Sequence, residues 1–280
     1  MYIQFASLFI LIAATVLIWS IVFAKEGGGV LTVAFLDVGQ GDAIFIETPS
    51  GNQILLDGGP DKKVLRELGK LMPFWDRSIN MVIASHPDTD HIGGLPSVVD
   101  RFDVEYYMRS AVVAQSDVYE VLESAIERGE VETIFARRGD VVDLGDGVVM
   151  EILFPDRNTE GFDPNVASII AKVSYGDTSF LLTGDSPAAI EEYLVSLDGS
   201  GLDVDVLKLG HHGSKTSSGE MMLGAAGPRY AVISAGENNR YGHPHKEVLE
   251  RLDQFGIPYL ETSENGAIVF ESDGTDIVLR

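Results

Sequence analysis

The chain of 280 residues contains no cysteine. This absence excludes disulfides and thiolate metal ligands together, so any metal site must be built from histidine and carboxylate side chains. It leaves the redox compartment open, because a chain without cysteine tolerates either an oxidising or a reducing one.

Positive charge is also scarce, since 20 Lys and Arg stand against 43 Asp and Glu and the formal net charge is −23. Such a surface repels polyanions at long range, and its simplest role is solubility. A nucleic-acid substrate would need local cations to overcome this field, and bound metal ions are the obvious source. The length allows one large domain or two small ones, with a substantial core in either case.

Residues 2–24 form a long apolar run with no charged side chain. As a helix they would span about 30 Å, the thickness of a hydrocarbon core, and Tyr2 and Trp19 would suit its two interfaces. We expect a membrane anchor rather than a secretory signal cleaved at Ala24, because no Lys or Arg precedes the run. A cleaved signal and a buried core helix remain the alternatives.

This segment sets the expected organisation. Residues 1–24 are the anchor or signal, residues 25–29 a short flexible linker, and residues 30–280 the catalytic domain. We expect a membrane-anchored protein whose catalytic domain lies outside the cytoplasm, with secretion as the alternative.

Along the rest of the chain, apolar runs alternate with turn signals and with helical spacing. Helices are predicted at residues 61–71, 117–128, 187–197 and 245–254, with another starting near Pro96. Strands are predicted at residues 31–36, 43–47, 53–56, 80–84, 148–153, 168–175, 178–183, 204–209, 230–234, 258–261, 266–270 and 276–279. Strand groups interleaved with helices predict an α/β fold of two packed sheets with helices outside. Residues 39–42 (Gly-Gln-Gly-Asp) are predicted as a hairpin turn, not a dinucleotide site, because no helix follows.

The densest group of metal-capable side chains lies in residues 85–94, directly after the predicted strand at 80–84. His86 and Asp88 are two residues apart and can face one site, while Asp90 and His91 can face a second. Two divalent ions roughly 3.5–4 Å apart, sharing a hydroxide, are a recognised arrangement for cleaving esters and phosphodiesters. All six histidines of the chain lie beside predicted strands in such polar segments.

Two further segments add to this group. Asp185 follows the strand at 178–183 and is predicted to bridge the ions, although it could instead be the N-cap of the helix at 187–197. Of the pair His211 and His212, we expect one to bind metal and the other to act on the substrate or behind a ligand.

These residues resemble a known family. Residues 85–94 (Ser-His-Pro-Asp-Thr-Asp-His-Ile-Gly-Gly) resemble the signature loop of the metallo-β-lactamase superfamily. Residues 35–43, 182–185, 207–218 and 239–245 are similar to segments of ComEC-type competence proteins, and they occur in the same order.

The resemblance implies an αββα sandwich with a dinuclear metal site at one edge of the two sheets. It also implies that Asp57 supports the metal loop as a structural residue. The implied ligands are His86, Asp88, Asp90, His91, Asp185 and either His211 or His212; we assign His211 to the metal. Asp88 stands where most members of the superfamily have His, and Asn165 stands near another usual ligand position. Oxygen donors at these places favour harder ions, so Mn²⁺ is expected as well as Zn²⁺.

The expected function is a metal-dependent nuclease or phosphodiesterase acting on DNA in competence or DNA uptake, through a metal-bridging hydroxide. Catalytic roles are expected for Asp90, His212 and His243. Substrate contacts are expected from Asn165, Ser214, Lys215, Arg240 and His245, and Lys208 either contacts phosphate or snorkels from its strand.

Two other functions remain open. One is hydrolysis of a small ester, lactone or cyclic phosphodiester, and the other is a non-catalytic, membrane-tethered binding module. The expected partners are DNA or another phosphodiester, the membrane, and a DNA-uptake channel. Because one apolar segment stands in place of the multi-helix channel of full-length ComEC-type proteins, DNA transport by this chain alone is not expected.

Overall fold

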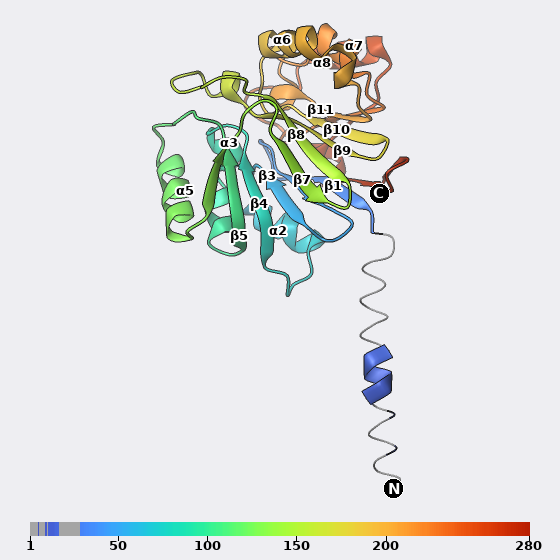
Figure 1. The fold of residues 1–280 in the computed structure, drawn as a ribbon. Helices are drawn as coiled ribbons and strands as arrows, with labels where there is room; N and C mark the ends of the chain where they lie inside the picture. The colour runs from blue at the N-terminus through green and yellow to red at the C-terminus, as the bar shows by residue number, and fades with distance from the viewer. Residues whose placement is uncertain (1–4, 6–8, 10, 17–28) are drawn as a thin grey trace.

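The structure is a computed structural model that describes residues 5, 9, 11–16 and 29–280 (Figure 1). Most of the predicted anchor and linker falls outside these residues. Within the described part of the chain, no helix is both long enough and apolar enough to cross a membrane. The anchor and its alternatives therefore stay predictions.

Two mixed sheets form the framework of the domain. The first has the strand order β15-β14-β1-β2-β3-β4-β5-β6, and the second has the order β13-β12-β11-β10-β9-β8-β7. The first comprises β1 (Leu31–Phe35), β2 (Ile44–Glu47), β3 (Gln53–Leu56), β4 (Ser78–Ala84), β5 (Asp103–Arg109), β6 (Glu132–Phe135), β14 (Ile268–Ser272) and β15 (Ile277–Leu279). The second comprises β7 (Val141–Gly145), β8 (Val148–Phe154), β9 (Ile170–Tyr175), β10 (Thr178–Leu182), β11 (Val206–Lys208), β12 (Tyr230–Ile233) and β13 (Tyr259–Glu261).

Strand direction determines where the polar loops gather. Strands β3 to β6 pair in parallel, and so do β10 to β13. The carboxyl ends of parallel neighbours emerge at the same edge of a sheet. The loops that follow β3, β4, β10 and β11 are the ones in which the sequence places its metal-capable side chains.

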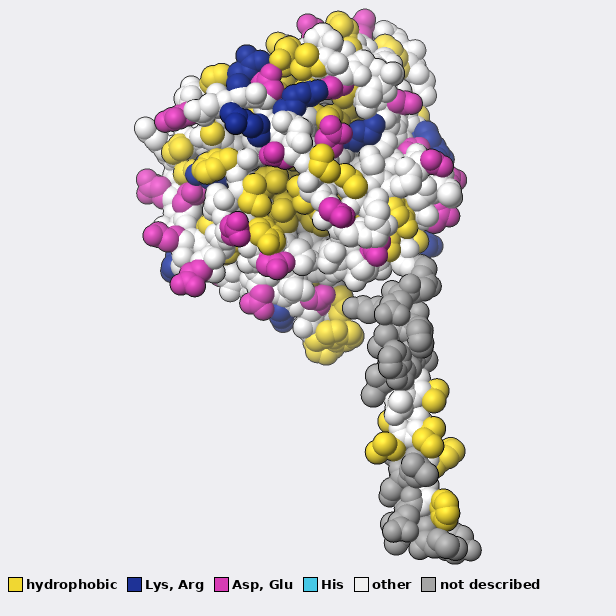
Figure 2. Space-filling model, in the orientation of Figure 1, with side chains coloured by type: hydrophobic (Ala, Val, Ile, Leu, Met, Phe, Trp, Pro, Cys, Tyr) yellow, Lys and Arg dark blue, Asp and Glu magenta, His cyan; other side chains and the backbone are white. Residues whose placement is uncertain are grey.

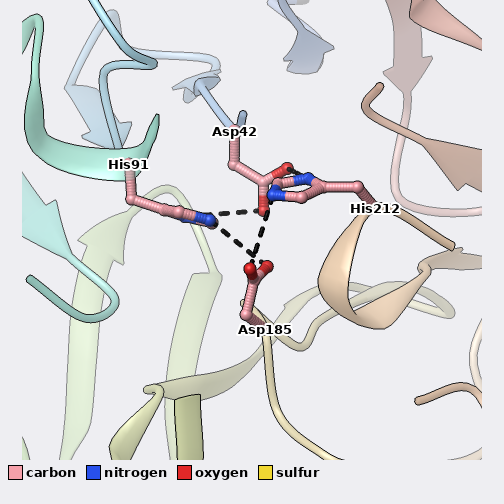
Figure 3. Close-up of side chains that lie close together, drawn as sticks. All are labelled: Asp42, His91, Asp185 and His212. Atoms are coloured by element: carbon pink, nitrogen blue, oxygen red, sulfur yellow. Dashed lines mark ion pairs between the residues drawn. The ribbon is translucent and has the colours of Figure 1, made fainter. Parts of the chain in front are cut away.

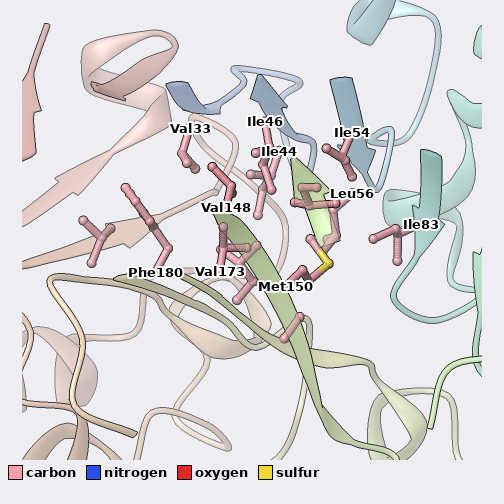
Figure 4. Close-up of a cluster of buried hydrophobic side chains, with 14 of the residues drawn as sticks. Val33, Ile44, Ile46, Ile54, Leu56, Ile83, Val148, Met150, Val173 and Phe180 are labelled. Carbon is pink, nitrogen blue, oxygen red and sulfur yellow. The ribbon is translucent and has the colours of Figure 1, made fainter. Parts of the chain in front are cut away.

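The two sheets pack face to face through alternate apolar side chains (Figure 4). Ile44, Ile46 and Leu56 of the first sheet belong to the same buried cluster as Val173 and Phe180 of the second. Because a strand alternates its faces, the opposite side chains of each sheet, such as Phe45 and Leu181, fall in two outer clusters beneath helices.

Helices cover both outer faces (Figure 1). The helices α2 (Lys63–Leu71), α3 (Thr89–Ile92), α4 (Leu95–Val99) and α5 (Asp117–Arg128) pack on the first sheet, and α6 (Ala188–Asp198), α7 (Glu220–Ala226) and α8 (Lys246–Phe255) pack on the second. The short α9 (Thr262–Asn265) follows β13. This arrangement confirms the predicted sandwich of two mixed sheets with outer helices. Residues 39–42 lie in the connection of the antiparallel pair β1–β2, as predicted.

Candidate metal centre

Asp185 lies at the meeting point of four histidines. The distances from a carboxylate oxygen of Asp185 to Nε2 are 3.9 Å for His86, 3.2 Å for His91, 3.7 Å for His211 and 3.4 Å for His212. These side chains come from the loops after β4, β10 and β11, and only 3% of Asp185 is exposed. The residue is not a helix cap, because α6 begins at Ala188 with Pro187 at its N-cap.

Three of these histidines are held from behind through Nδ1. Nδ1 of His91 lies 2.8 Å from Oδ2 of Asp57, and Nδ1 of His212 lies 3.3 Å from Oδ1 of Asp42. Nδ1 of His86 lies 3.0 Å from the Ser85 hydroxyl. A partner on one ring nitrogen fixes the ring's orientation and leaves the other nitrogen for a metal. Here the Nε2 atoms are left, and they converge on Asp185; Figure 3 shows those of His91 and His212.

Asp57 sits where the sequence predicts a supporting carboxylate. It is fully buried at the end of β3, with a left-handed φ of 61°. Its carboxylate accepts hydrogen bonds from the amide and the hydroxyl of Ser85, at 2.8 and 2.7 Å. It therefore contacts both the start of the metal loop and the ring of His91.

Asp42 and Lys208 are the residues that sequence reasoning missed or misplaced. Both are fully buried, and Nζ of Lys208 forms an ion pair with Asp42 and donates to the carbonyl of Gly184 at 3.1 Å. Nζ also lies 3.9 Å from Asp185. The expectation that Lys208 contacts phosphate or snorkels is therefore wrong, because its ammonium group is enclosed and already paired.

Both residues carried a signal in the sequence. A lysine inside the apolar strand Val-Leu-Lys almost never stays buried without a partner, so it implied a buried acid elsewhere. Asp42 lies just before the apolar strand β2 and is the last residue of the predicted turn at residues 39–42. No spacing rule links the two residues, since the fold alone brings their strands together.

Backbone strain is concentrated at the paired histidines. His211 and His212 lie in the short helical turn Gly210–Gly213 with φ values of 50° and 56°. A left-handed conformation is unfavourable for a residue with a Cβ by roughly 1–2 kcal/mol. Such strain persists where the surroundings fix it, and it gathers at functional sites.

The charges of the site are strongly coupled. Burial favours the neutral form of His91 and His212, but the carboxylates beside them, Asp185 above all, hold both pKa values well above the ordinary range. Burial, reinforced by the charge of His91, lowers the pKa of His86 to about 3. The pKa of Asp185 lies well below its usual range, because His212 and His91 outweigh the effect of burial. At neutral pH the acid is ionised.

Unsatisfied buried atoms show that the arrangement fits a divalent cation. Within the described residues, several buried atoms at the centre lack a hydrogen-bond partner: Nε2 of His86, His91 and His212 and Oδ1 of Asp185. Leaving buried polar atoms unsatisfied costs about 1–3 kcal/mol each. A cation at their meeting point would satisfy several together. Asp42, His91, Asp185 and His212 each place a ligand atom within 4.8 Å of the others.

The remaining predicted metal ligands border this group. Oδ2 of Asp88 lies 3.7 Å from Nε2 of His86, and Oδ2 of Asp90 lies 3.3 Å from Nε2 of His212. Burial raises the pKa of Asp88, whereas contact with His212 and His91 lowers that of Asp90 despite its burial.

The predicted catalytic His243 lies on the outer side of the paired histidines. Its ring centroid is 5.5 Å from that of His211 and 6.2 Å from that of His212. Burial and the neighbouring histidines lower its pKa to about 4, so the ring is neutral at pH 7.

The predicted substrate-binding residues divide into two groups. Arg240 is exposed and lines a hollow of 410 Å³ that also contains Asp90. Three others form contacts within and between loops: the Ser214 hydroxyl lies 2.9 Å from that of Thr216, and the Lys215 amide donates to Nδ1 of His245 at 3.1 Å. Asn165 belongs to the turn Asn165–Ala167, and no described residue forms a hydrogen bond with its buried Oδ1. The substrate-binding roles of these residues stay predictions.

Comparison with known proteins identifies the family. The model of the metallo-beta-lactamase superfamily matches residues 36–237, which is more than half of the chain. The chain belongs to the metallo-beta-lactamase superfamily. Among solved structures of the fold, Igni18, a metallo hydrolase from Ignicoccus hospitalis, aligns with 85% of this chain and 98% of its own, at a TM-score of 0.56 and 14% identity. That likeness concerns the fold.

Curated relatives place the chain more narrowly within the superfamily. ComE operon protein 3 of Bacillus subtilis is 33% identical over 260 residues, covering 85% of this chain and 32% of that protein. Competence protein ComA of Neisseria gonorrhoeae is 32% identical over 242 residues, again covering 85% and 32%. The chain thus spans about a third of the length of these relatives. The resemblance to the lactamase-like domain of ComEC-type proteins is confirmed, and family and site together support a metal-dependent hydrolase.

Proposed function

We propose that this chain is a metal-dependent phosphodiesterase that cleaves DNA in a competence or DNA-uptake setting. The observation that carries the proposal is the convergence of four imidazole Nε2 atoms on the buried carboxylate of Asp185. Three of those rings are held from behind, which is how metal-binding histidines are oriented. Two relatives of the chain are competence proteins, and on that basis we propose that its DNA cleavage takes place in competence or DNA uptake.

The geometry supports cation binding around Asp185, whose Oδ1 faces His91 and whose Oδ2 faces His86 and His212. Asp88 lies beside His86, and Asp90 lies beside His212. His212 is the better ligand of the adjacent pair, because it is buried, is held by Asp42 and faces both Asp90 and Asp185. We therefore propose His212 as the metal ligand and His211 as the residue that acts on the substrate, which reverses the roles expected from the sequence.

Divalent ions held here would lower the pKa of a water molecule and neutralise charge on the attacked phosphate. His211, whose side chain is 29% exposed, is then placed to contact the substrate beside the neutral His243. A ring with a pKa of about 4 carries almost no proton at pH 7, so His243 is suited to hydrogen bonding rather than to proton donation. Asp88 adds an oxygen donor, which makes Mn²⁺ a suitable ion besides Zn²⁺.

The hollow beside Asp90 supports a nucleic-acid substrate over a small ester or lactone. It has a volume of 410 Å³, and its lining includes the half-buried Gln40 and Asn239 and the exposed Arg240. Arg240 lies over the ring of Tyr241 at 4.7 Å, and 48% of Tyr241 is exposed. A cation and an exposed aromatic ring suit a phosphate and a base.

A substrate panel tests this function. The 280-residue chain loaded with Mn²⁺ or Zn²⁺ would be incubated with end-labelled linear DNA, a cyclic dinucleotide, bis(p-nitrophenyl) phosphate and a lactone. We expect cleavage of the linear DNA. A metal-loaded chain that hydrolyses only the lactone or only the cyclic dinucleotide would establish the small-molecule alternative. Binding of DNA without hydrolysis of any substrate would establish the non-catalytic one.

A further inference from the structure

A second hollow, of 510 Å³, lies outside the metal centre and is rich in arginine. We call it the arginine hollow, and its lining includes Arg109, Val113, Phe135, Arg137, Arg157 and Glu160. Two of its three arginines are paired with acids, Arg109 with Glu123 and Arg157 with Asp156, so among the described residues Arg137 supplies the free positive charge of the lining. Figure 2 shows several Lys and Arg on the upper part of the face in view, with Asp and Glu spread over the whole of that face.

The hollow lies along the same sheet edge as the metal loop. Arg109 ends β5 and Phe135 ends β6, and these strands are successive parallel neighbours of β4, whose carboxyl end leads to His86. Arg109 also lines a smaller hollow together with His86 and Pro87. One residue therefore borders both the metal loop and the arginine hollow.

The side chains of the hollow are available to a ligand. Arg137 is exposed, and among the described residues nothing forms a hydrogen bond or ion pair with its guanidinium group. Phe135 is 55% exposed, and the guanidinium group of Arg109 lies 4.7 Å from the centre of its ring. Arg109 also pairs with Glu123 at 3.4 Å, and Arg157 pairs with Asp156, so these two are held in place.

We propose that the arginine hollow binds a single-stranded part of a polynucleotide whose cleaved phosphate lies at the metal centre. This inference rests on the proposed function and adds a substrate site to it. Arg137 would contact backbone phosphate, and Phe135 would stack on a base. The 410 Å³ hollow beside Asp90 and the arginine hollow would then hold the strand on the two sides of the cleaved bond.

The chemistry of the lining favours a single strand over a duplex. An exposed phenyl ring beside a guanidinium group offers a stacking surface, and only an unpaired base can lie flat on it. The charge of Arg137 opposes locally the repulsion that the acidic surface exerts on a polyanion. Duplex DNA would use the arginines alone.

The test uses the full chain and compares a single strand, the matching duplex and bis(p-nitrophenyl) phosphate. Phe135→Ala combined with Arg137→Ala is expected to raise the KM for a 20-nucleotide single strand roughly tenfold, the loss of one stacked base and one phosphate contact. The kcat/KM for bis(p-nitrophenyl) phosphate, which is too small to reach the hollow, should stay within twofold. Arg229→Ala is the matched control, because Arg229 is exposed just before β12, at the opposite end of the strands, and should change neither value.

Every other outcome either supports or overturns the proposal that the arginine hollow binds a single strand. An unchanged KM for the single strand would overturn the proposal, as would an equal loss on duplex and single-stranded DNA. Wild-type chain that cleaves no phosphodiester would contradict the proposed function instead. Fluorescence anisotropy of the same labelled strand would then still test the hollow, since weaker binding by the double variant supports it and equal binding overturns it. Phe135→Tyr, which keeps the ring, should restore most of the binding lost in Phe135→Ala.

Discussion

The buried ion pair of Asp42 and Lys208 places an ammonium group 3.9 Å from Asp185, the carboxylate that four histidines face. Removing one partner of a buried pair leaves an uncompensated charge and destabilises a protein by about 3–5 kcal/mol. We expect Lys208→Met to lower the free energy of unfolding by about that amount in urea titrations. Asp42→Asn with Lys208→Met should recover part of it. Lys215→Met, which changes an exposed lysine, should have little effect on the free energy of unfolding. Equal losses of stability in Lys208→Met and Lys215→Met would contradict the role given to the ion pair.

Metal binding should release protons, because His91 and His212 hold theirs at neutral pH and must lose them from Nε2 to become ligands. Affinity for Mn²⁺ should therefore rise with pH. Calorimetry in buffers of different ionisation enthalpy would count the protons released. His212→Asn should release about one proton fewer than the wild type, whereas His243→Asn should release the same number, since His243 is already neutral.

Glu191 links the stability of the second sheet's loops to pH. It is 1% exposed and accepts hydrogen bonds from the amides of Ser218 and Gly219, at 2.8 and 2.9 Å. Burial nevertheless raises its pKa from 4.5 to about 7. A raised pKa in the folded state means that its contribution to stability is complete below pH 4.5 and is lost as the pH rises through 7.

We expect Glu191→Gln to remove this dependence. Between pH 4.5 and 7.5 the free energy of unfolding of the wild type should fall by up to roughly 3 kcal/mol relative to the variant. Chemical denaturation across that range measures the difference. Glu192→Gln changes the adjacent, exposed carboxylate and serves as the control. Parallel curves for the wild type and Glu191→Gln would show that the shift is absent.

At the scale of elements, the loops of the first sheet fix the position of the metal loop through their backbones. The amide of Asp42 donates to the carbonyl of Asp90 at 3.2 Å, and the amide of Gly58 donates to that of His91 at 2.6 Å. Gly41 allows this approach, because it has a φ of +130° and a Cβ there would lie 2.0 Å from the carbonyl oxygen of Asp90.

Gly41→Ala should therefore displace the metal loop and weaken Mn²⁺ binding at least tenfold, as loss of outer-shell support commonly does. Gly51→Ala is a matched control, since Gly51 has a φ of +90° with nothing within 4 Å of an added Cβ. It should lower stability by roughly 1–2 kcal/mol without changing metal affinity. Equal metal affinities in the two variants would contradict the close approach.

The sequence predicts elements well where apolar periodicity is strong. The helix at 117–128 begins and ends as predicted, with Ser116 as its N-cap and Gly129 as its C-cap. Strands β5 and β6 were not predicted, because β6 is largely exposed and charged residues alternate with apolar ones in β5. Helix α7, with its small residues and no strong periodicity, was missed for a similar reason.

The candidate site shows the same limit. The loop at 85–94 could be predicted as part of a metal site from its own residues, since four potential ligands lie together in it. The choice between His211 and His212 could not, because it depends on which ring Asp42 orients after the fold has formed. From the sequence, Lys208 could be placed only as a charged residue in a predicted strand. The packing of the sheets is what encloses its side chain beside Asp42.

For the whole molecule, the two-sheet framework brings the candidate metal ligands, together with Arg109, Arg137 and Arg240, to the loop-bearing edges of the sheets. The acidic remainder of the surface disfavours binding of a polyanion anywhere else. The metal centre, the hollow beside Asp90 and the arginine hollow together form a candidate path for a phosphodiester chain. This account depends on Asp185, because every candidate ligand histidine faces it.

The measurement that tests this most directly is the rate of linear DNA cleavage by the Mn²⁺-loaded chain and by Asp185→Asn, with bound metal counted in the same samples. We predict that the wild type binds Mn²⁺ and cleaves, and that the variant loses metal and at least a hundredfold in rate, in line with removal of a central catalytic group. A metal-loaded wild type that leaves DNA intact, or a variant that cleaves as fast as the wild type, would contradict the account.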